Sequence, residues 1–343
     1  MIQVVTIEEA VGCALAHDIT EIRQGEFKGP AFQKGYILKP GDLDHLRRIG
    51  KQHLYVLKLE SDQMHEDEAA EAMAAALCGQ GVGWNEAPRE GKVTLKATRD
   101  GLFKVDVQAL LRFNLLGDVM CATRHSHTVV NSGDTLAGTR AIPLVVPRSV
   151  VQSAVDAART ATGGVLRVLP MMKARVGVII TGNEVYYGHI QDKFQPVIMK
   201  KIDQFKSEVL DVKFLPDDDA LIAQTALDLV EGGADVIITT GGMSVDPDDR
   251  TRFALKKAGA GEMVYGSAVL PGAMFMVAYL KGIPILGIPA CGMYADATIF
   301  DLIFPRVLAG EKITREDIAA LGHGGLCLNC KTCRFPVCPF GKA

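Results

Sequence analysis

The sequence predicts an α/β protein: a parallel sheet with helices on both faces, preceded by a smaller α+β and β-rich N-terminal region. Three apolar strands carry the first part of this prediction, namely Val176–Ile180, Asp235–Ile238 and Ile283–Ile288. Helical patterns separate these strands, and parallel neighbours need crossovers of such length. A polar, glycine-containing turn follows each of the first two strands. Because the carboxyl ends of parallel strands meet at one edge, we expect a site for a phosphorylated ligand there.

The remaining elements follow from periodicity and composition. Glu66–Leu77 is rich in alanine and glutamate and is predicted to be a helix. Short alternating stretches between Lys92 and Pro147, separated by glycine and asparagine, predict a small β-rich module. Helices are predicted in the α/β part at Gln195–Lys206, Asp219–Glu231, Arg250–Lys257 and Tyr294–Leu308. We therefore expect an α+β segment at 1–60, a helix with a β-rich module at 61–148, the α/β domain at 172–310 and a cysteine-rich tail at 322–343.

Composition narrows the class of protein. The 343 residues include 37 basic and 40 acidic ones, for a net charge of −3, so no basic footprint for nucleic acid is present. The longest apolar runs are shorter than the roughly 18–20 residues that span a bilayer, so we expect no membrane segment. The first residues lack the basic and apolar regions of a signal peptide, which predicts a cytoplasmic location.

The turn Thr239–Ser244 is the strongest candidate for binding an anion. Gly241 and Gly242 would let the backbone approach a ligand closely. The helix predicted from near Asp249 would present its positive N-terminal end to the same place. The alternative is a plain strand-to-helix turn in which an aspartate caps the helix.

A second candidate feature is a run of three aspartates, Asp217, Asp218 and Asp219, after Pro216. One aspartate would cap the helix that begins there, which leaves two unexplained. Carboxylates near a phosphate site suggest hydrated Mg²⁺, which is held by one or two carboxylates together with ligand phosphates. Glu184, which follows the first strand, could cap its own turn or reach the same cleft.

The third feature is a cluster of cysteines in the tail, with the spacing Cys327-x₂-Cys330-x₂-Cys333-x₄-Cys338. Thiolates at this spacing suit an iron–sulfur cluster or tetrahedral Zn²⁺, and the sequence leaves both open. A disordered tail with free thiols is the alternative. Three glycines at 322, 324 and 325 suggest a hinge before the cysteines, so that the metal would organise the tail and not the main fold.

These motifs together resemble one family. Residues from about 175 to 309 resemble the molybdopterin-binding domain shared by Mog-type adenylyltransferases, gephyrin and the molybdenumtransferases. The matching pieces keep the family's order and spacing: Thr181–Val185, Leu215–Asp218, Thr239–Val245, Asp249, Pro271-Gly272 and Gly287–Pro289. The N-terminal part resembles the molybdenumtransferases more loosely, at Thr6–Gly12 and at Gly133–Arg140.

The resemblance implies molybdopterin or its adenylylated form as ligand, with Mg²⁺ as cofactor, molybdate or tungstate as a further partner, and a homo-oligomer. The glycine-rich turn of the family holds the terminal phosphate of the pterin. Carried over residue by residue, the binding residues are Thr181, Gly182, Asn183, Thr240, Gly241, Gly242, Met243, Ser244 and Pro289. Asp217 and Asp249 would work with the metal and the reacting phosphate, and Glu184 would lie in the same site.

The chain departs from the transferases at three places. Gly29–Gly35 stands where they carry an Asp-Asn-Ser-Ala-Met-Asp-Gly stretch. Leu270 and Ala273 stand where they carry lysines, and Pro289–Gly292 replaces a Pro-Gly-Asn-Pro turn. Two main hypotheses follow: an enzyme that acts on molybdopterin, or a non-catalytic carrier or sensor of the pterin. A third keeps the fold and binds nucleotides.

Overall fold

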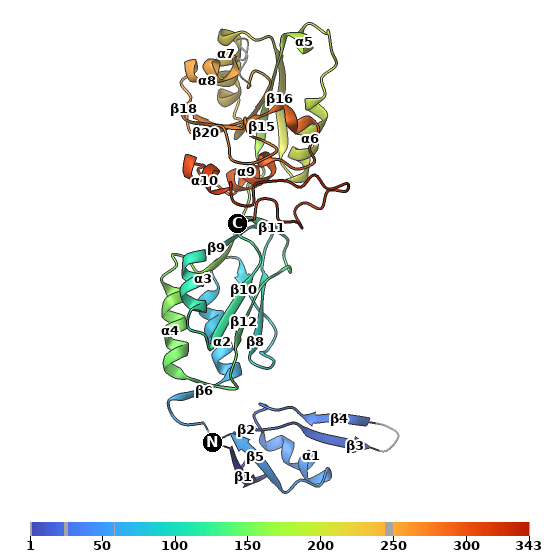
Figure 1. Cartoon of the computed structure of the whole chain (residues 1–343), viewed down its shortest axis with the longest axis vertical. Coiled ribbons are helices and arrows are strands. Elements are labelled where there is room, and N and C mark those ends of the chain that lie inside the picture. The colour runs from blue at the N-terminus through green and yellow to red at the C-terminus, as the bar shows by residue number, and fades with distance from the viewer. Residues whose placement is uncertain (1, 24–26, 58, 244–249, 343) are drawn as a thin grey trace. The chain divides into compact units, whose positions relative to one another are not determined.

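The computed structural model describes residues 2–23, 27–57, 59–243 and 250–342 (Figure 1). The chain forms two compact units, one built mainly from residues 1–168 and the other mainly from residues 169–343. No helix among these described residues is long and apolar enough to cross a membrane.

The first unit opens with a small α+β segment. Its elements are β1 (Ile2–Thr6), β2 (Ala14–Leu15), β3 (Ile19–Arg23), β4 (Phe27–Phe32), η1 (Pro40–Asp42), α1 (Leu43–Arg48) and β5 (His53–Leu57). Strand β5 pairs antiparallel with β1 and β2, while β3 and β4 form a hairpin. Leu15, Leu46 and Val56 are fully buried where α1 covers the sheet.

The second part of this unit is strand-rich, as the glycine-punctuated sequence predicts. The strands in this stretch of the chain are β6 (Gln63–His65), β7 (Val82–Gly83), β8 (Lys92–Ala97), β9 (Gly101–Val105), β10 (Val119–Thr123), β11 (Thr128–Val130), β12 (Thr135–Ala141), β13 (Val145–Pro147) and β14 (Leu166–Leu169). Its helices are α2 (Glu66–Leu77), α3 (Val107–Asn114) and α4 (Arg148–Arg159). The helix predicted at Glu66–Leu77 is confirmed at both ends, and it packs on α4 and on β12.

The second unit contains a six-stranded sheet in the order β16-β15-β17-β20-β19-β18. The strands are β15 (Arg175–Thr181), β16 (Glu208–Leu215), β17 (Val236–Thr240), β18 (Gly261–Tyr265), β19 (Met276–Leu280) and β20 (Ile283–Ile288). The first four in spatial order are parallel, which confirms the predicted parallel sheet, while β19 runs antiparallel to both β20 and β18. The sheet is therefore mixed and has three strands beyond those predicted.

Helices cover both faces of this sheet, as predicted. They are α5 (Asn183–Tyr186), α6 (Phe194–Gln204), α7 (Asp219–Glu231), α8 (Thr251–Lys257), η2 (Ala290–Met293), α9 (Ile299–Leu308) and α10 (Arg315–Ala320). One apolar cluster joins α6 and α9 to the sheet, and a second joins α7 and α8 to its other face. Alternate residues of β15 enter the two clusters, with Val178 in the first and Ile179 in the second.

One predicted helix is wrong at its start. The sequence pattern predicts a helix from Tyr294 to Leu308, but the chain forms the short η2 and then α9, which begins only at Ile299. A capping box sets this start, because the Thr298 hydroxyl accepts a bond from the Phe300 N–H while the Asp301 carboxylate accepts one from the Thr298 N–H. Residues 294–298 are thereby left as an irregular segment.

Candidate ligand-binding site at the carboxyl edge of the sheet

A cavity of about 500 Å³ lies at the carboxyl ends of β15, β17 and β20. Its walls come from the three turns after these strands and from the segment before α6. The lining residues include Thr181, Glu184, Lys193, Gly241, Gly242, Met243, Pro289, Met293 and Tyr294. A cavity therefore lies at the edge of the sheet where the parallel strands predict a binding site.

The turn at Gly241–Met243 is shaped by close backbone packing. Gly241 has φ of +84°, and a Cβ added there would lie 2.0 Å from the carbonyl oxygen of Thr181. A Cβ on Gly242, where φ is +57°, would lie 2.4 Å from the hydroxyl of Thr251. Both glycines are therefore required by this structure, and they leave backbone groups at the cavity wall without side chains in front of them.

Buried hydroxyls hold that turn in place. Thr181 and Thr251 are at most 4% exposed, and their hydroxyl oxygens lie 3.1 Å apart. The Thr251 hydroxyl also donates to the Gly241 carbonyl oxygen at 3.1 Å. From the other side, the Tyr265 hydroxyl donates to the Met243 carbonyl oxygen at 2.7 Å. The turn is fixed by bonds to two elements before any ligand is bound.

The three aspartates have three different environments. Asp217 bonds to the turn after β15, since its carboxylate accepts from the Asn183 N–H at 3.0 Å and its own N–H donates to the Asn183 side chain at 3.2 Å. Asp218 caps α7 by accepting from the N–H groups of Ala220 and Leu221. Asp219 forms a two-bond ion pair with Arg250, and that guanidinium lowers the pKa of the carboxyl group. Among these bonds, those of Asp217 connect it to the turn after β15, which lines the cavity.

The structure brings most of the sequence-predicted site residues to this edge. Six of them line the cavity directly, namely Thr181, Glu184, Gly241, Gly242, Met243 and Pro289. Gly182 is buried at φ of +144°, and Thr240 is fully buried at the end of β17. Ser244 and Asp249 lie outside the described residues. The roles assigned to all of these residues stay predictions.

Several cavity residues carry no sequence motif and were not predicted. Lys193 contributes a cation to the cavity lining, and Met293 and Tyr294 extend the lining beyond Pro289. The Asp192 carboxylate accepts from the N–H groups of Phe194 and Gln195, which starts α6 beside the cavity. This cap is readable from sequence, because an aspartate precedes the helix by two residues. The placement of Lys193 depends on the tertiary fold.

The tail cysteines are present as four free thiols. Across residues 2–23, 27–57, 59–243 and 250–342, no three histidine, cysteine or acidic side chains are gathered closely enough to hold a metal ion. The predicted Mg²⁺, and the predicted iron–sulfur cluster or Zn²⁺, therefore stay predictions.

The fold and the cavity define a class: an α/β domain with a cavity at the carboxyl edge of its sheet, next to a glycine-rich turn. Comparison with known proteins identifies a more specific class. Residues 177–309 match the family described as "Probable molybdopterin binding domain". Residues 4–58 match a family described only as a domain of unknown function.

Individual proteins are similar to parts of this chain. A molybdopterin molybdenumtransferase of Haemophilus influenzae is 29% identical over 158 residues, which cover 43% of this chain and 39% of that protein. A CinA-like protein of Syntrophus aciditrophicus is 34% identical over 96 residues, which cover 28% of this chain and 23% of that protein. The solved structure of the molybdopterin biosynthesis enzyme MoaB from Thermus thermophilus is 21% identical and matches 40% of this chain and 98% of that one, with a TM-score of 0.34.

The second unit therefore contains a domain of the molybdopterin-binding family, as the resemblance predicts. The matched region spans about two fifths of the length of the molybdenumtransferase.

Proposed function

We propose that this protein binds molybdopterin or adenylyl-molybdopterin in the 500 Å³ cavity and acts on it during assembly of a molybdenum or tungsten cofactor. The observation that carries the proposal is the turn Gly241–Met243. Its two glycines expose backbone at the cavity wall, and the buried hydroxyls hold it rigid. A rigid, uncovered backbone turn is the arrangement that binds a phosphate group.

The reaction class that fits this site is phosphoryl-type chemistry on the pterin phosphate. The amides of Gly241 and Gly242, with Ser244, would hold the phosphate, and Lys193 would offset its negative charge. Asp217 and Asp249 would place the attacking group or the metal, with Glu184 beside them. Positioning and charge stabilisation would supply most of the rate, since such reactions ask little covalent chemistry of the protein.

The described carboxylates fit Mg²⁺ only together with a ligand. Asp217 is joined to the cavity through Asn183, and Glu184 lines the wall. One or two carboxylates plus phosphate oxygens and water form the usual magnesium environment. When bound, the ion would offset charge on the phosphate.

The test is turnover of adenylyl-molybdopterin by the full chain with Mg²⁺ and molybdate. Asp217→Asn and Glu184→Gln should each lower kcat about 100-fold or more while leaving the fold intact. Asp219→Asn is the matched control, because its carboxylate sits two residues away but pairs with Arg250. Equal losses in Asp217→Asn and the control would show that Asp217 has no special role.

A second candidate is a carrier that binds the pterin without chemistry. Leu270 and Ala273 stand where the transferases carry lysines, and the backbone of Leu270 is paired with the tail. Titration with molybdopterin separates the candidates, because tight binding without turnover supports the carrier. Preferential binding of pyridine nucleotides in the same titration would instead support the nucleotide hypothesis.

We also propose self-association. Tyr187 and Ile190, just beyond α5, are 64% and 54% exposed, so apolar surface is available for contact with a second copy. Sedimentation showing only a monomer at micromolar concentration would contradict this.

A further inference from the structure

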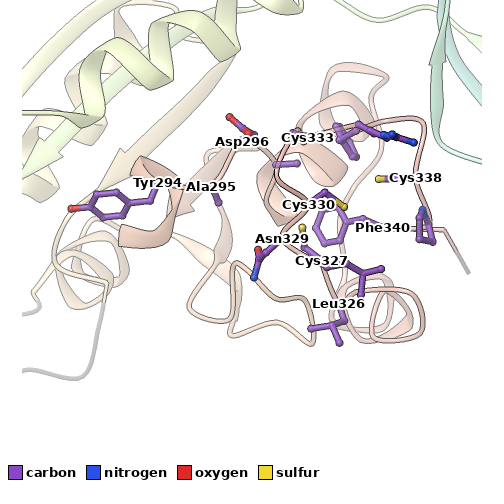
Figure 2. A pocket seen from close by; sticks show the side chains of 15 residues that line it. Tyr294, Ala295, Asp296, Leu326, Cys327, Asn329, Cys330, Cys333, Cys338 and Phe340 are labelled. Carbon is purple, nitrogen blue, oxygen red and sulfur yellow. The ribbon is translucent and has the colours of Figure 1, made fainter.

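All four tail cysteines line one cavity of about 250 Å³ in the second unit (Figure 2). Cys327 and Cys338 are half-buried and pack against the apolar cluster of α6 and α9, whereas Cys330 and Cys333 are exposed. That all four share one cavity is a tertiary feature, which their spacing in the sequence does not show. The lining therefore supplies four soft sulfur donors, the kind that iron–sulfur clusters and Zn²⁺ accept.

The tail is held on the α/β unit at both ends of this cysteine loop. Before it, the Leu270 N–H donates to the Gly325 carbonyl oxygen and the Cys327 N–H donates to the Leu270 carbonyl oxygen, both at 2.8 Å. After it, Phe340 is 3% exposed, and the Gly341 N–H donates to the Gly324 carbonyl oxygen at 2.9 Å. The glycines therefore do not separate the tail from the domain. Fixed ends lower the entropy cost of gathering the thiolates around a metal.

The opposite wall of the cysteine cavity is the segment Tyr294–Ala297, which also reaches the ligand cavity. Tyr294 lines both cavities, and Figure 2 shows its ring pointing away from the cysteines. The Lys201 ammonium donates to the Asp296 carbonyl oxygen at 3.2 Å and pairs with Asp301 at 2.6 Å, so α6 holds this segment. One stretch of irregular backbone thus separates the two cavities.

We propose that the four thiolates bind a thiophilic metal centre, either an iron–sulfur cluster or Zn²⁺, and that its binding orders residues 290–297 and changes the affinity of the ligand cavity. The four thiols are not gathered as a metal-binding group in the described residues, so ligation would have to draw their sulfur atoms toward one another and reshape the cavity that Tyr294–Ala297 also lines. Residues 294–297 line both this cavity and, through Tyr294, the ligand cavity, so a change in their packing would reach both sites. The effect on affinity rests on the proposed function, whereas the ordering does not.

Metal binding is tested first, on the full chain purified without oxygen. One sample is used directly, and others are reconstituted with iron and sulfide or with Zn²⁺. We expect either brown protein with broad absorption near ~400 nm or colourless protein with about one Zn²⁺ per chain. Cys330→Ser and Cys333→Ser should lose the metal, and Cys13→Ser, a matched control in the first unit, should retain it. Failure of every sample to bind metal would overturn the proposal.

The second measurement is hydrogen exchange of residues 290–297 with and without the metal. We expect exchange to slow about fivefold or more on loading, and Cys330→Ser to remove the difference. Metal binding with unchanged exchange there would overturn the proposed coupling. Hydrogen exchange is measured without pterin. It therefore tests the ordering of residues 290–297 even if the proposed function is wrong.

The third measurement is the affinity for molybdopterin, which should differ about fivefold or more between metal-loaded and metal-free protein. By reciprocity, bound pterin should change metal affinity by the same factor. Tyr294→Ala, which removes the exposed side chain of the residue that lines both cavities, should reduce both effects together while metal still binds. A pterin affinity that is identical with and without metal would contradict the coupling.

Discussion

The ligand cavity and the cysteine cavity lie in the same unit but are built in opposite ways. The first is formed by turns at strand ends, where Gly241 and Thr251 are fixed by backbone packing and buried hydroxyls. The second is formed by an irregular loop whose donors Cys330 and Cys333 are exposed. The turn at the ligand cavity is therefore organised without a ligand, whereas the cysteine cavity would need the proposed metal to bring its thiolates together.

A substitution in the turn that forms the ligand cavity should have the largest effect on stability. Gly241→Ala places a Cβ against the Thr181 carbonyl oxygen and forces alanine to a φ of +84°. We expect the second unit to lose about 3 kcal/mol of stability and its ligand binding. The matched control is Gly261→Ala in the same unit, where no atom lies within 4 Å of the added Cβ.

This experiment has an internal reference. The only tryptophan, Trp84, lies in the first unit, so its fluorescence reports that unit alone. Hydrogen exchange of β15 and β17 amides reports the second unit. Gly241→Ala should raise exchange in β15 and β17 without moving the Trp84 transition. If both variants behaved alike, close packing at Gly241 would not shape the turn.

The second prediction concerns the helix that precedes the tail. Partial burial raises the pKa of Asp317, but hydrogen bonds from Thr314 and Arg306 outweigh it and lower the pKa to about 2. A lowered pKa stabilises the folded state above the unfolded value of 3.8, and this contribution is lost as pH falls toward 2. The pKa difference corresponds to about 2 kcal/mol.

Asp317→Asn should therefore lower the free energy of unfolding by about 2 kcal/mol at pH 7. The gap between wild type and variant should shrink between pH 4 and pH 2, where the wild-type carboxylate becomes protonated. Urea denaturation across this pH range measures it. Glu316→Gln, a change of the neighbouring carboxylate, is the control, and a gap that did not depend on pH would contradict the role given to Asp317.

Sequence reasoning located the edge of the sheet and most candidate residues because strand ends, glycines and capping aspartates leave local signals. It predicted α7 to the residue because Asp218 caps it, and α2 to the residue because its alanine and glutamate content favours a helix. It missed β19, whose antiparallel pairing with β20 is a tertiary feature, and it extended α9 too far because the apolar residues before Thr298 continue the pattern. Neither Lys193 at the ligand cavity nor the wall shared with the cysteines is readable without the fold.

The third prediction concerns the Thr181 hydroxyl, which belongs to the network that holds the turn Gly241–Met243. Thr181→Val keeps the shape of the side chain but removes the hydroxyl that bonds to Thr251 and to the Thr240 carbonyl oxygen. We expect a loss of about 1 kcal/mol in stability and a weaker affinity for the proposed pterin, because the buried hydroxyl network loses the bonds of Thr181. Thr160→Val, which changes an exposed threonine in the first unit, is the control. Unchanged affinity would show that the hydroxyl network does not position the turn.

The last prediction concerns the cysteine cavity and has the smallest expected effect. Cys330 is exposed and lies on the irregular loop, so in metal-free protein Cys330→Ser should change the free energy of unfolding by less than about 0.5 kcal/mol. Anaerobic urea denaturation in the presence of a chelator measures this. With metal present, wild type should gain stability through mass action and the variant should not. A large loss already in metal-free protein would mean that Cys330 supports the fold itself, and the cysteine cavity would then be as organised as the ligand cavity.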